Sequence, residues 1–335
     1  MAANDTPAIR RARELCQQFP HAPNRQLARM LYAEFKTHYA NQEAARNAIR
    51  RLRGVIGDAM RKVYKNREPW EPQQAGWKPK LPPSQVEAWT PIEIAGPARV
   101  LSLSDIHCPF HDERALTAAV EHGRKLKPDT VVLLGDVIDF YSISRFERHP
   151  GKRDAVSEIS ATKELLGWLR SKFRRQRFIY MIGNHERRWQ TFVWNKCEEL
   201  WQLSGLQFHN VLDFDGFGIE LCDDRPIMAG KLPMLHGHEL QKGIAAPVNQ
   251  ARWAFMKTMH SLIVGHGHRT STHCEPDIFG REVTCWSQGH LSDPHPAYAR
   301  ANKFNWGFAF IDVAANGEFN VNNFRISPDY QVRAA

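Results

Sequence analysis

Phe178-Ile-Tyr-Met-Ile-Gly-Asn-His-Glu186 is a short apolar run that stops at Gly183 and is followed by three polar side chains. Such a run is typical of a strand that is buried on both faces in a parallel sheet covered by helices. In open α/β sheets, ligands bind just beyond the carboxyl ends of the strands. The stretch therefore predicts a parallel strand with a binding site at its end.

The same pattern recurs along the chain. In the first stretch the polar residues after the run are Asn184 and His185. Four further apolar runs are followed by polar side chains in the same way. They are VLSLSD (100–105) with Asp105 and His107, TVVLLGD (130–136) with Asp136 and Asp139, LPML (232–235) with His236, and SLIVG (261–265) with His266 and His268. Side chains at i and i+2 of an extended backbone point the same way. We therefore expect Asp105 and His107 to hold one ion together, and likewise His266 and His268.

The chemistry of these side chains indicates a metal site. Imidazole, carboxylate and amide groups suit Mn, Fe, Zn or Ni better than Ca or Mg. The ligands are too many for one ion, and a carboxylate is a natural bridge between two. Two divalent ions with Asp105 and Asp136 would leave a positive centre suited to phosphate, and a hydroxide bridging the ions would be the nucleophile. We expect manganese first, with nickel, iron, zinc or magnesium as alternatives.

The order of the expected elements predicts an α/β fold. Strands over 100–105, 130–136 and 178–183 alternate with helices over about 112–126, over about 156–175 and from about 186. The later half has few long helices, and short strands are expected near 217–222, 232–236, 261–265, 282–287, 307–313 and 318–326. This mixture predicts two sheets packed together, with helices outside them.

Five motifs along the chain resemble those of the calcineurin-like metallophosphoesterases. They are Asp105-x-His107, Gly135-Asp136-x-x-Asp139, Gly183-Asn184-His185-Glu186, His236 in HGH, and Gly265-His266-x-His268. Their order is that of the family. The resemblance covers residues 98–327 and implies the four-layer α/β/β/α sandwich of that family.

The resemblance also implies a role for each residue. One metal ion would be held by Asp105, His107 and His268, the other by Asn184, His236 and His266, and Asp136 would bridge them. His185 would contact the phosphate and protonate the leaving oxygen. Asp139 would orient His185, as a carboxylate orients a catalytic imidazole elsewhere.

Two departures from the family pattern bear on function. The Asp-Arg-Gly sequence of Ser/Thr protein phosphatases is absent after the second motif, which makes a protein phosphatase less expected. His238 is close enough to His236 to be an alternative ligand. The pattern SDIHCPFHD (104–112), with an N-terminal helical segment and the late Trp306-Gly307, is also similar to phosphoesterases carried by phages and prophages.

The net charge of +9 belongs to the N-terminal segment, because residues 1–67 hold 14 of the 45 Lys and Arg but only 5 of the 36 Asp and Glu. A first short helix is expected over 8–19. A second is expected after Asn24 as N-cap, and an arginine-rich third from Asn41 to a C-cap at Gly54. This pattern is compatible with a helix-turn-helix-like module that binds nucleic acid. Ordinary solvated helix faces are the alternative.

The chain is therefore predicted to have three parts. Residues 1–65 form the basic helical segment, and residues 98–327 form the metallophosphoesterase domain. Between them, residues 66–97 contain seven prolines and three tryptophans, which predicts an extended linker without helix or central strand.

Nucleic acid is the expected substrate, cleaved by a phosphodiesterase or nuclease reaction. The basic segment suggests an anionic partner, and Arg187, Arg188 and Arg269 beside the motifs could pair with flanking phosphates, although such arginines are also common on ordinary surfaces. One alternative is a phosphomonoesterase or small-nucleotide phosphodiesterase whose N-terminal helices form a lid or an oligomer contact. Another is a DNA-binding or scaffold protein with a disabled phosphoesterase domain, against which the complete ligand set argues.

The composition predicts a cytoplasmic protein without a membrane partner. No apolar stretch approaches the roughly 18 residues that a membrane span needs, and the N-terminal MAANDTPAIRRAR has no apolar signal-peptide core. None of the six cysteines has Cys-x-x-Cys spacing, so neither a zinc knuckle nor a thioredoxin-type site is indicated.

Overall fold

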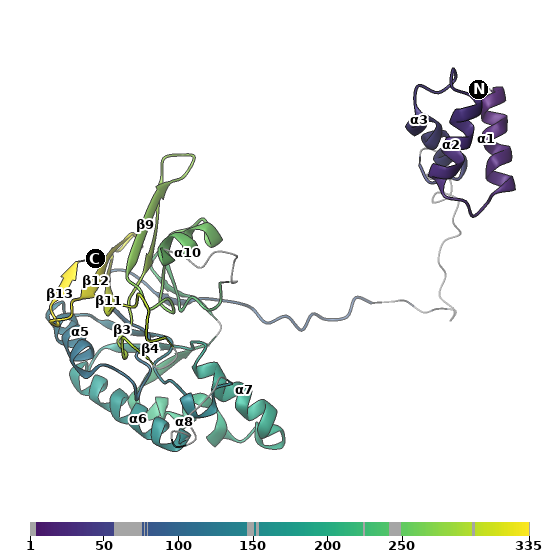
Figure 1. Ribbon diagram of the computed structural model, residues 1–335. Coiled ribbons are helices and arrows are strands. Elements are labelled where there is room, and N and C mark those ends of the chain that lie inside the picture. The colour runs from purple at the N-terminus through teal and green to yellow at the C-terminus, as the bar shows by residue number, and fades with distance from the viewer. Residues whose placement is uncertain are drawn as a thin grey trace. The chain divides into compact units, whose positions relative to one another are not determined.

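The computed structural model describes residues 5–56, 76, 78, 80–145, 151, 154–223, 225–240, 249–296 and 299–334. The chain divides into two compact units, Met1–Gln85 and Val86–Ala335, and each is described by itself (Figure 1). Much of the predicted linker, namely residues 66–75, 77 and 79, lies outside the described residues.

The described residues of the first unit form the helices α1 (Pro7–Gln18), α2 (Asn24–Glu34) and α3 (Gln42–Leu52). Their apolar residues recur at helical spacing and therefore fall on one face of each helix. Among the described residues, the large side chains that are fully buried at the centre of the unit are Leu15, Leu27, Leu31 and Ile49. The three predicted short helices are confirmed.

The ends of α3 confirm both predicted caps. The Asn41 side chain accepts a hydrogen bond of 2.8 Å from the Ala44 N–H, and Gly54 adopts a φ of 69° after the last turn. The prediction that Asn24 caps α2 is wrong. Pro23 holds the N-cap position, and the Asn24 side chain instead accepts a hydrogen bond of 2.8 Å from Arg53.

The second unit is built on two sheets. The seven-stranded sheet has the order β13-β12-β11-β2-β3-β4-β5, in which β2 to β5 are parallel. Its strands are β2 (Ala98–Leu103), β3 (Thr130–Leu134), β4 (Arg177–Met181), β5 (Ile219–Cys222), β11 (Gly307–Val313), β12 (Phe319–Ile326) and β13 (Val332–Ala334). The six-stranded sheet has the order β1-β6-β7-β8-β10-β9. Its strands are β1 (Ile92–Ile94), β6 (Ile227–Ala229), β7 (Leu232–Leu235), β8 (Leu262–Val264), β9 (Ser271–Pro276) and β10 (Glu282–Ser287).

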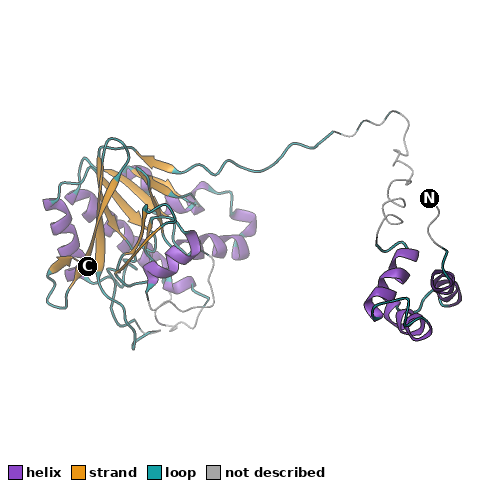
Figure 2. Ribbon diagram, turned by 90° about the horizontal axis from the view of Figure 1, so that it is seen from above, coloured by secondary structure: helices purple, strands orange, loops and turns teal. Residues whose placement is uncertain are grey.

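Helices cover the outer faces of both sheets (Figures 1 and 2). They are α5 (Glu113–Lys125), α6 (Ala155–Lys172), α7 (Glu186–Lys196), α8 (Phe208–Val211), α9 (Phe214–Phe217) and α10 (Gln250–Thr258), with short 3-10 helices η1 (Tyr141–Ile143), η3 (Glu198–Leu200) and η4 (Ser204–Leu206). Along β3, Val131 and Leu133 join the core beneath α5 and α6, whereas Val132 and Leu134 join the core between the sheets. Ala251 of α10 packs on the other side of the six-stranded sheet. The predicted α/β/β/α layering is confirmed.

The elements that the sequence did not predict are β1, β6, β9, β13, α8, α9, α10 and the short 3-10 helices η1, η3 and η4. Strands β1, β6 and β13 have only three residues each, and most side chains of β9 are exposed, so neither set shows a clear apolar pattern. Strands β1 and β13 also lie outside the range 98–327 that was predicted for the domain. Within the part of the chain that the structure describes, no helix has the length and apolarity of a membrane span.

Candidate metal centre

The predicted ligands come together where the strands end. Asp105 and His107 follow β2, Asp136 and Asp139 follow β3, Asn184 and His185 follow β4, His236 follows β7, and His266 and His268 follow β8. Because β2, β3 and β4 are parallel, their carboxyl ends lie at one edge of their sheet, and the same holds for β7 and β8. The two edges supply ligands to one centre.

The first ligand group contains Asp105, His107 and His268, all of them buried. The Nε2 atom of His268 lies 3.1 Å from Oδ1 of Asp105 and 3.2 Å from Nε2 of His107. The second oxygen of Asp105 accepts a hydrogen bond of 2.9 Å from the His266 N–H. This bond fixes the carboxylate so that Oδ1 faces the two imidazoles.

The second ligand group contains Asp136, His236 and His266. Oδ2 of Asp136 lies 3.2 Å from Nε2 of His236 and 4.0 Å from Nε2 of His107, so this oxygen stands between the two groups. The Nδ1 atom of His236 lies 2.7 Å from the carbonyl oxygen of Leu134. That hydrogen bond requires a proton on Nδ1, so Nε2 is the nitrogen that could face a metal ion.

A third group joins the first ligand group to the predicted catalytic histidine. Oδ1 of Asp139 lies 2.9 Å from Nδ1 of His107 and 3.0 Å from Nδ1 of His185. Asp139 therefore contacts His185, as the resemblance implied. It also holds the ring of His107, which the sequence did not predict.

The donor atoms fit a pair of divalent metal ions. Among the described residues, Oδ1 of Asp105, Oδ1 of Asn184 and Nε2 of His236 are buried atoms without a hydrogen-bond partner. Such atoms are costly unless something else satisfies them. Carboxylate oxygens, an amide oxygen and imidazole nitrogens are ligands that divalent transition metals accept. The cluster therefore supports binding of divalent metal ions.

Two of the proposed ligands, Asp136 and His266, already have charge states that suit ligation. Burial would raise the pKa of Asp136, but His185 and His236 outweigh this effect and hold its pKa well below the usual range. Burial and His236 lower the pKa of His266 to about 4. At neutral pH, Asp136 is thus an anion and His266 a neutral imidazole, which are the forms that bind metal. At His236, in contrast, burial would lower the pKa, but Asp136 outweighs this effect and holds the pKa well above its ordinary value, so metal binding would displace a proton from this ring.

The backbone at these positions differs from the expected one. Five of the predicted ligands have left-handed φ values, namely Asp105 (53°), His107 (52°), Asp136 (53°), His266 (60°) and His268 (53°). This conformation is uncommon outside glycine and clusters at functional sites. The expected extended backbone is therefore wrong, although Asp105 and His107 do fall in one ligand group as expected. His266 and His268, in contrast, fall in different ligand groups.

Gly183 is needed because Asp136 lies against it. A Cβ atom at this position would stand 2.2 Å from Oδ1 of Asp136 and 2.5 Å from its backbone nitrogen. We expect Gly183→Ala to lower kcat/KM about a hundredfold, since a displacement of roughly 1 Å at an active site costs that much. The matched control is Gly167→Ala within α6, where the new Cβ would lie at an ordinary 3.5 Å from Phe217. Equal activity of the two variants would contradict this account.

Glu186 holds the turns after β3 and β4 together, a role that the sequence did not reveal. Its carboxylate is fully buried and accepts hydrogen bonds from the N–H groups of Asp136 (3.0 Å), Val137 (2.8 Å) and Gly183 (2.8 Å) and from the hydroxyl of Tyr180 (2.8 Å). Its partners are mainly backbone groups, which no side-chain pattern could indicate. Glu186 thereby places the Asp136 turn next to the Asn184 turn.

His290 is a buried neighbour of the centre that the sequence reading missed. Its ring stacks on that of His268, with centroids 5.1 Å apart and an interplanar angle of 13°. Its Nδ1 atom lies 2.7 Å from Oγ of Ser292. His290 follows β10 as the predicted ligands follow their strands, so the same signal could have found it.

The predicted substrate residue Arg188 lies beside the predicted catalytic histidine, His185. Its Nη2 atom is 2.8 Å from Nε2 of His185, and its Nη1 atom donates a hydrogen bond of 2.9 Å to the Asp139 carbonyl oxygen. Because Nδ1 of His185 also faces this carbonyl oxygen, at 2.9 Å, Nε2 is the acceptor in the observed arrangement.

The other two predicted substrate residues, Arg187 and Arg269, and the alternative ligand His238 lie around the centre. The Nε atom of Arg187 lies 3.4 Å from Nε2 of His238. Arg269 directly follows the last ligand and is half-buried. His238 belongs to none of the candidate metal groups of the described residues, whereas His236 does, which favours His236 as the ligand.

Comparisons with known proteins agree with this geometry. The family described as calcineurin-like phosphoesterase matches residues 98–294. The Gene 54 protein of Mycobacterium phage L5 is 30% identical over 232 residues, which cover 64% of this chain and 89% of the relative. The Gene 54 protein of Mycobacterium phage D29 is 29% identical over 235 residues, which cover 65% and 90%. Both relatives come from phages, in line with the resemblance to phage-borne enzymes.

A similar fold occurs in a single mutant of Vps29 from Entamoeba histolytica, at 14% identity and a TM-score of 0.38, with 71% of this chain and 97% of that chain covered. At this level the similarity concerns the fold alone. The family match carries more weight, because it spans more than half of the chain and its range contains every predicted ligand. The chain therefore belongs to the calcineurin-like phosphoesterase family and is a metal-dependent hydrolase of phosphate esters.

Proposed function

We propose that the protein is a two-metal phosphodiesterase that cleaves nucleic acid, with manganese as its metal. Asp105, His107 and His268 would hold one ion, Asn184, His236 and His266 the other, and Asp136 would serve both. When bound, such a pair of ions supplies positive charge for the phosphate and lowers the pKa of bound water. The protein residues around the ions would then orient the phosphate and donate a proton to the leaving oxygen.

His185 is the proposed proton donor to the leaving oxygen. Burial lowers the pKa of His185, but Asp136 and Asp139 outweigh this effect and leave the pKa above its ordinary value. The contact with Asp139 fixes one ring nitrogen, and Nε2 lies 3.8 Å from the central oxygen of Asp136. Nε2 therefore faces the place where a phosphate would be bound.

Arg188 would change partners when substrate binds. In the observed arrangement its guanidinium donates a hydrogen bond to Nε2 of His185. A phosphate oxygen is a stronger partner for a guanidinium than a neutral imidazole nitrogen, because the hydrogen bond is then ionic at both ends. We infer that Arg188 turns to the phosphate and frees Nε2 to carry the proton.

The observation that supports nucleic acid as substrate is the charge of the first unit. Among its described residues, Arg25 and Arg29 of α2 and Arg50 and Arg51 of α3 have no ion-pair partner. Other arginines of the unit are neutralised, as Arg13 is by Asp5 at 2.8 Å. Unpaired arginines on neighbouring helices are available to phosphates of a polyanion.

Replacing the unpaired arginines of α3 should weaken binding to DNA. We expect Arg50→Gln combined with Arg51→Gln to raise the Kd for a labelled oligonucleotide and to reduce the slope of log Kd against log salt by roughly 1 to 2, since each phosphate contact contributes about 0.7 to 0.9. The matched control removes two arginines that face Asp5, by Arg10→Gln with Arg13→Gln. Fluorescence anisotropy over a salt series measures both. An equal loss in the two variants would contradict a role for α3.

The direct test of the proposed function is cleavage. The manganese-loaded protein is incubated with single-stranded and double-stranded DNA and RNA, with bis-p-nitrophenyl phosphate as the small diester. Cleavage of a polynucleotide is expected. Turnover of the small diester without cleavage of any polynucleotide would refute the nuclease proposal and favour small phosphate esters as substrates.

A further inference from the structure

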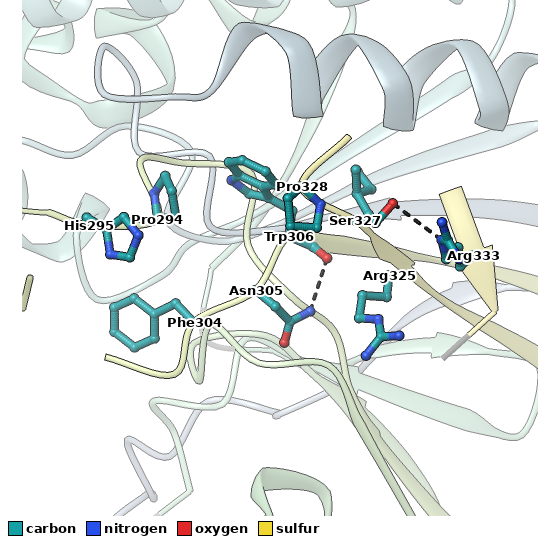
Figure 3. A pocket seen from close by; sticks show the side chains of 10 residues that line it. Pro294, His295, Phe304, Asn305, Trp306, Arg325, Ser327, Pro328 and Arg333 are labelled. Atoms are coloured by element: carbon teal, nitrogen blue, oxygen red, sulfur yellow. Dashed lines mark hydrogen bonds between the residues drawn. The ribbon is translucent and has the colours of Figure 1, made fainter. Parts of the chain in front are cut away.

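We infer that a groove beside the metal centre binds an unpaired nucleotide that flanks the scissile phosphate; this rests on the proposed nuclease function. The groove is a cavity of about 560 Å³ lined by His295, Phe304, Trp306, Arg325 and Arg333, together with neighbouring residues (Figure 3). Its size is within the range of ligand pockets, roughly 300 to 1,000 Å³. We call it the flanking groove.

The flanking groove shares a wall with the metal centre. The ring of Phe304 contacts that of the proposed metal ligand His268, with centroids 4.7 Å apart. The next residue, Asn305, donates a backbone hydrogen bond of 3.0 Å to the carbonyl oxygen of His268. A chain with its phosphate at the centre would therefore have its neighbouring nucleotide close to this groove.

Two arginines give the groove an anion-binding character. Arg325 of β12 and Arg333 of β13 are directly opposite each other in the antiparallel register, so their side chains stand on one face. Arg325 has no ion-pair partner among the described residues, and Arg333 has only a distant one, with Nη2 3.9 Å from Asp329. Both arginines are exposed, and Arg333 donates only a long hydrogen bond of 3.4 Å to Oγ of Ser327, so a phosphate would be the stronger partner for either side chain.

Aromatic side chains line the same groove. Trp306 is fixed in place, because its Nε1–H donates a hydrogen bond of 2.9 Å to the Ser292 carbonyl oxygen and Tyr330 stacks on it at 5.1 Å. His295 and Phe304 lie at the other end from the arginines (Figure 3). Aromatic rings beside cationic groups are how proteins bind single-stranded nucleic acid, since bases stack on the rings and phosphates pair with the cations.

This combination selects the ligand class. A phosphate alone would need the arginines but not the rings, and an apolar ligand would need the rings but not the arginines. A nucleotide with an unpaired base uses both. We therefore expect the enzyme to prefer single-stranded over double-stranded substrate of the same sequence.

The test is the double variant Arg325→Gln with Arg333→Gln in the full chain. With a single-stranded oligonucleotide we expect kcat/KM to fall about tenfold or more, since loss of one charge-assisted contact costs roughly that factor. Turnover of bis-p-nitrophenyl phosphate should stay within about twofold, because this diester has no second phosphate. Anisotropy with the same oligonucleotide, in the absence of added metal, should show the same loss of affinity.

The matched control is Arg174→Gln. Arg174 is exposed, has no ion-pair partner among the described residues and precedes β4, at the opposite edge of the sheet from the metal centre. Wild-type kinetics of the double variant on the oligonucleotide would overturn the groove inference and leave the nuclease proposal intact. An equal loss on both substrates would overturn it too, because the arginines would then support the fold. Failure of the wild type to cleave any polynucleotide refutes the nuclease proposal, and the inference with it.

Discussion

Asp136→Ala is expected to remove both bound metal and activity. Oδ2 of Asp136 lies between the two ligand groups, 3.2 Å from His236 and 4.0 Å from His107. No other described carboxylate occupies such a position in both groups. We expect metal affinity to fall at least about a hundredfold, because even residues that only support ligands contribute roughly 10- to 100-fold. Metal content by mass spectrometry and kcat/KM with bis-p-nitrophenyl phosphate measure the two effects.

The matched control for this prediction is His238→Ala. His238 lies beside His236 but belongs to neither ligand group of the described residues. This variant should keep its metal, and it also decides between His236 and His238 as the ligand. Thermal unfolding of the metal-free variants establishes that each is folded. If Asp136→Ala kept both ions, Asp136 would not be the shared ligand.

His185→Ala should lower kcat by about 100- to 10,000-fold, the usual contribution of a general acid, while metal content stays near that of the wild type. His185 contacts Asp139 and Arg188 and lies 3.8 Å from Asp136, yet it is not one of the proposed ligands. The loss should be larger for an oligonucleotide than for bis-p-nitrophenyl phosphate, because p-nitrophenolate is a good leaving group that needs little protonation.

The pH dependence of kcat is a second test of His185 as the proton donor. Its pKa is raised above the ordinary value because Asp136 and Asp139 outweigh burial. This shift applies to the metal-free protein, whereas kcat is measured with the ions bound. Because the proposed acid must carry its proton, kcat for an oligonucleotide should fall as pH rises through the pKa that His185 has in the metal-loaded enzyme. This fall in kcat with rising pH should be absent in His185→Ala. A variant that lost its metal instead would show that His185 is a ligand and that its assigned role is wrong.

The sequence predicted the fold and the ligands wherever a buried strand ends at a polar residue. At β4, the apolar run and the abrupt change at Gly183 were both visible, and the structure places Asn184 and His185 as expected. The prediction was wrong where it assumed a local geometry. The pairs Asp105/His107 and His266/His268 have left-handed φ values instead of an extended backbone, and only the first pair shares one ligand group.

Other features were beyond a pattern in the sequence because their causes are tertiary. The partners of Glu186 are backbone amides of two turns that are about 50 residues apart along the chain. The groove arginines come together only through the register of β12 and β13. Strand β9 has mostly exposed side chains, and its pairing with β10 defines it. A sequence pattern reports burial, and none of these features depends on burial alone.

The most direct test of the two-metal account is the metal content of the purified wild-type protein after loading with manganese and removal of free ions. The arrangement of six proposed ligands around a shared seventh, Asp136, predicts about two ions per chain. Reconstitution of bis-p-nitrophenyl phosphate hydrolysis should follow the occupancy of both sites. Well under one ion per chain, or full activity in metal-free protein, would contradict the account.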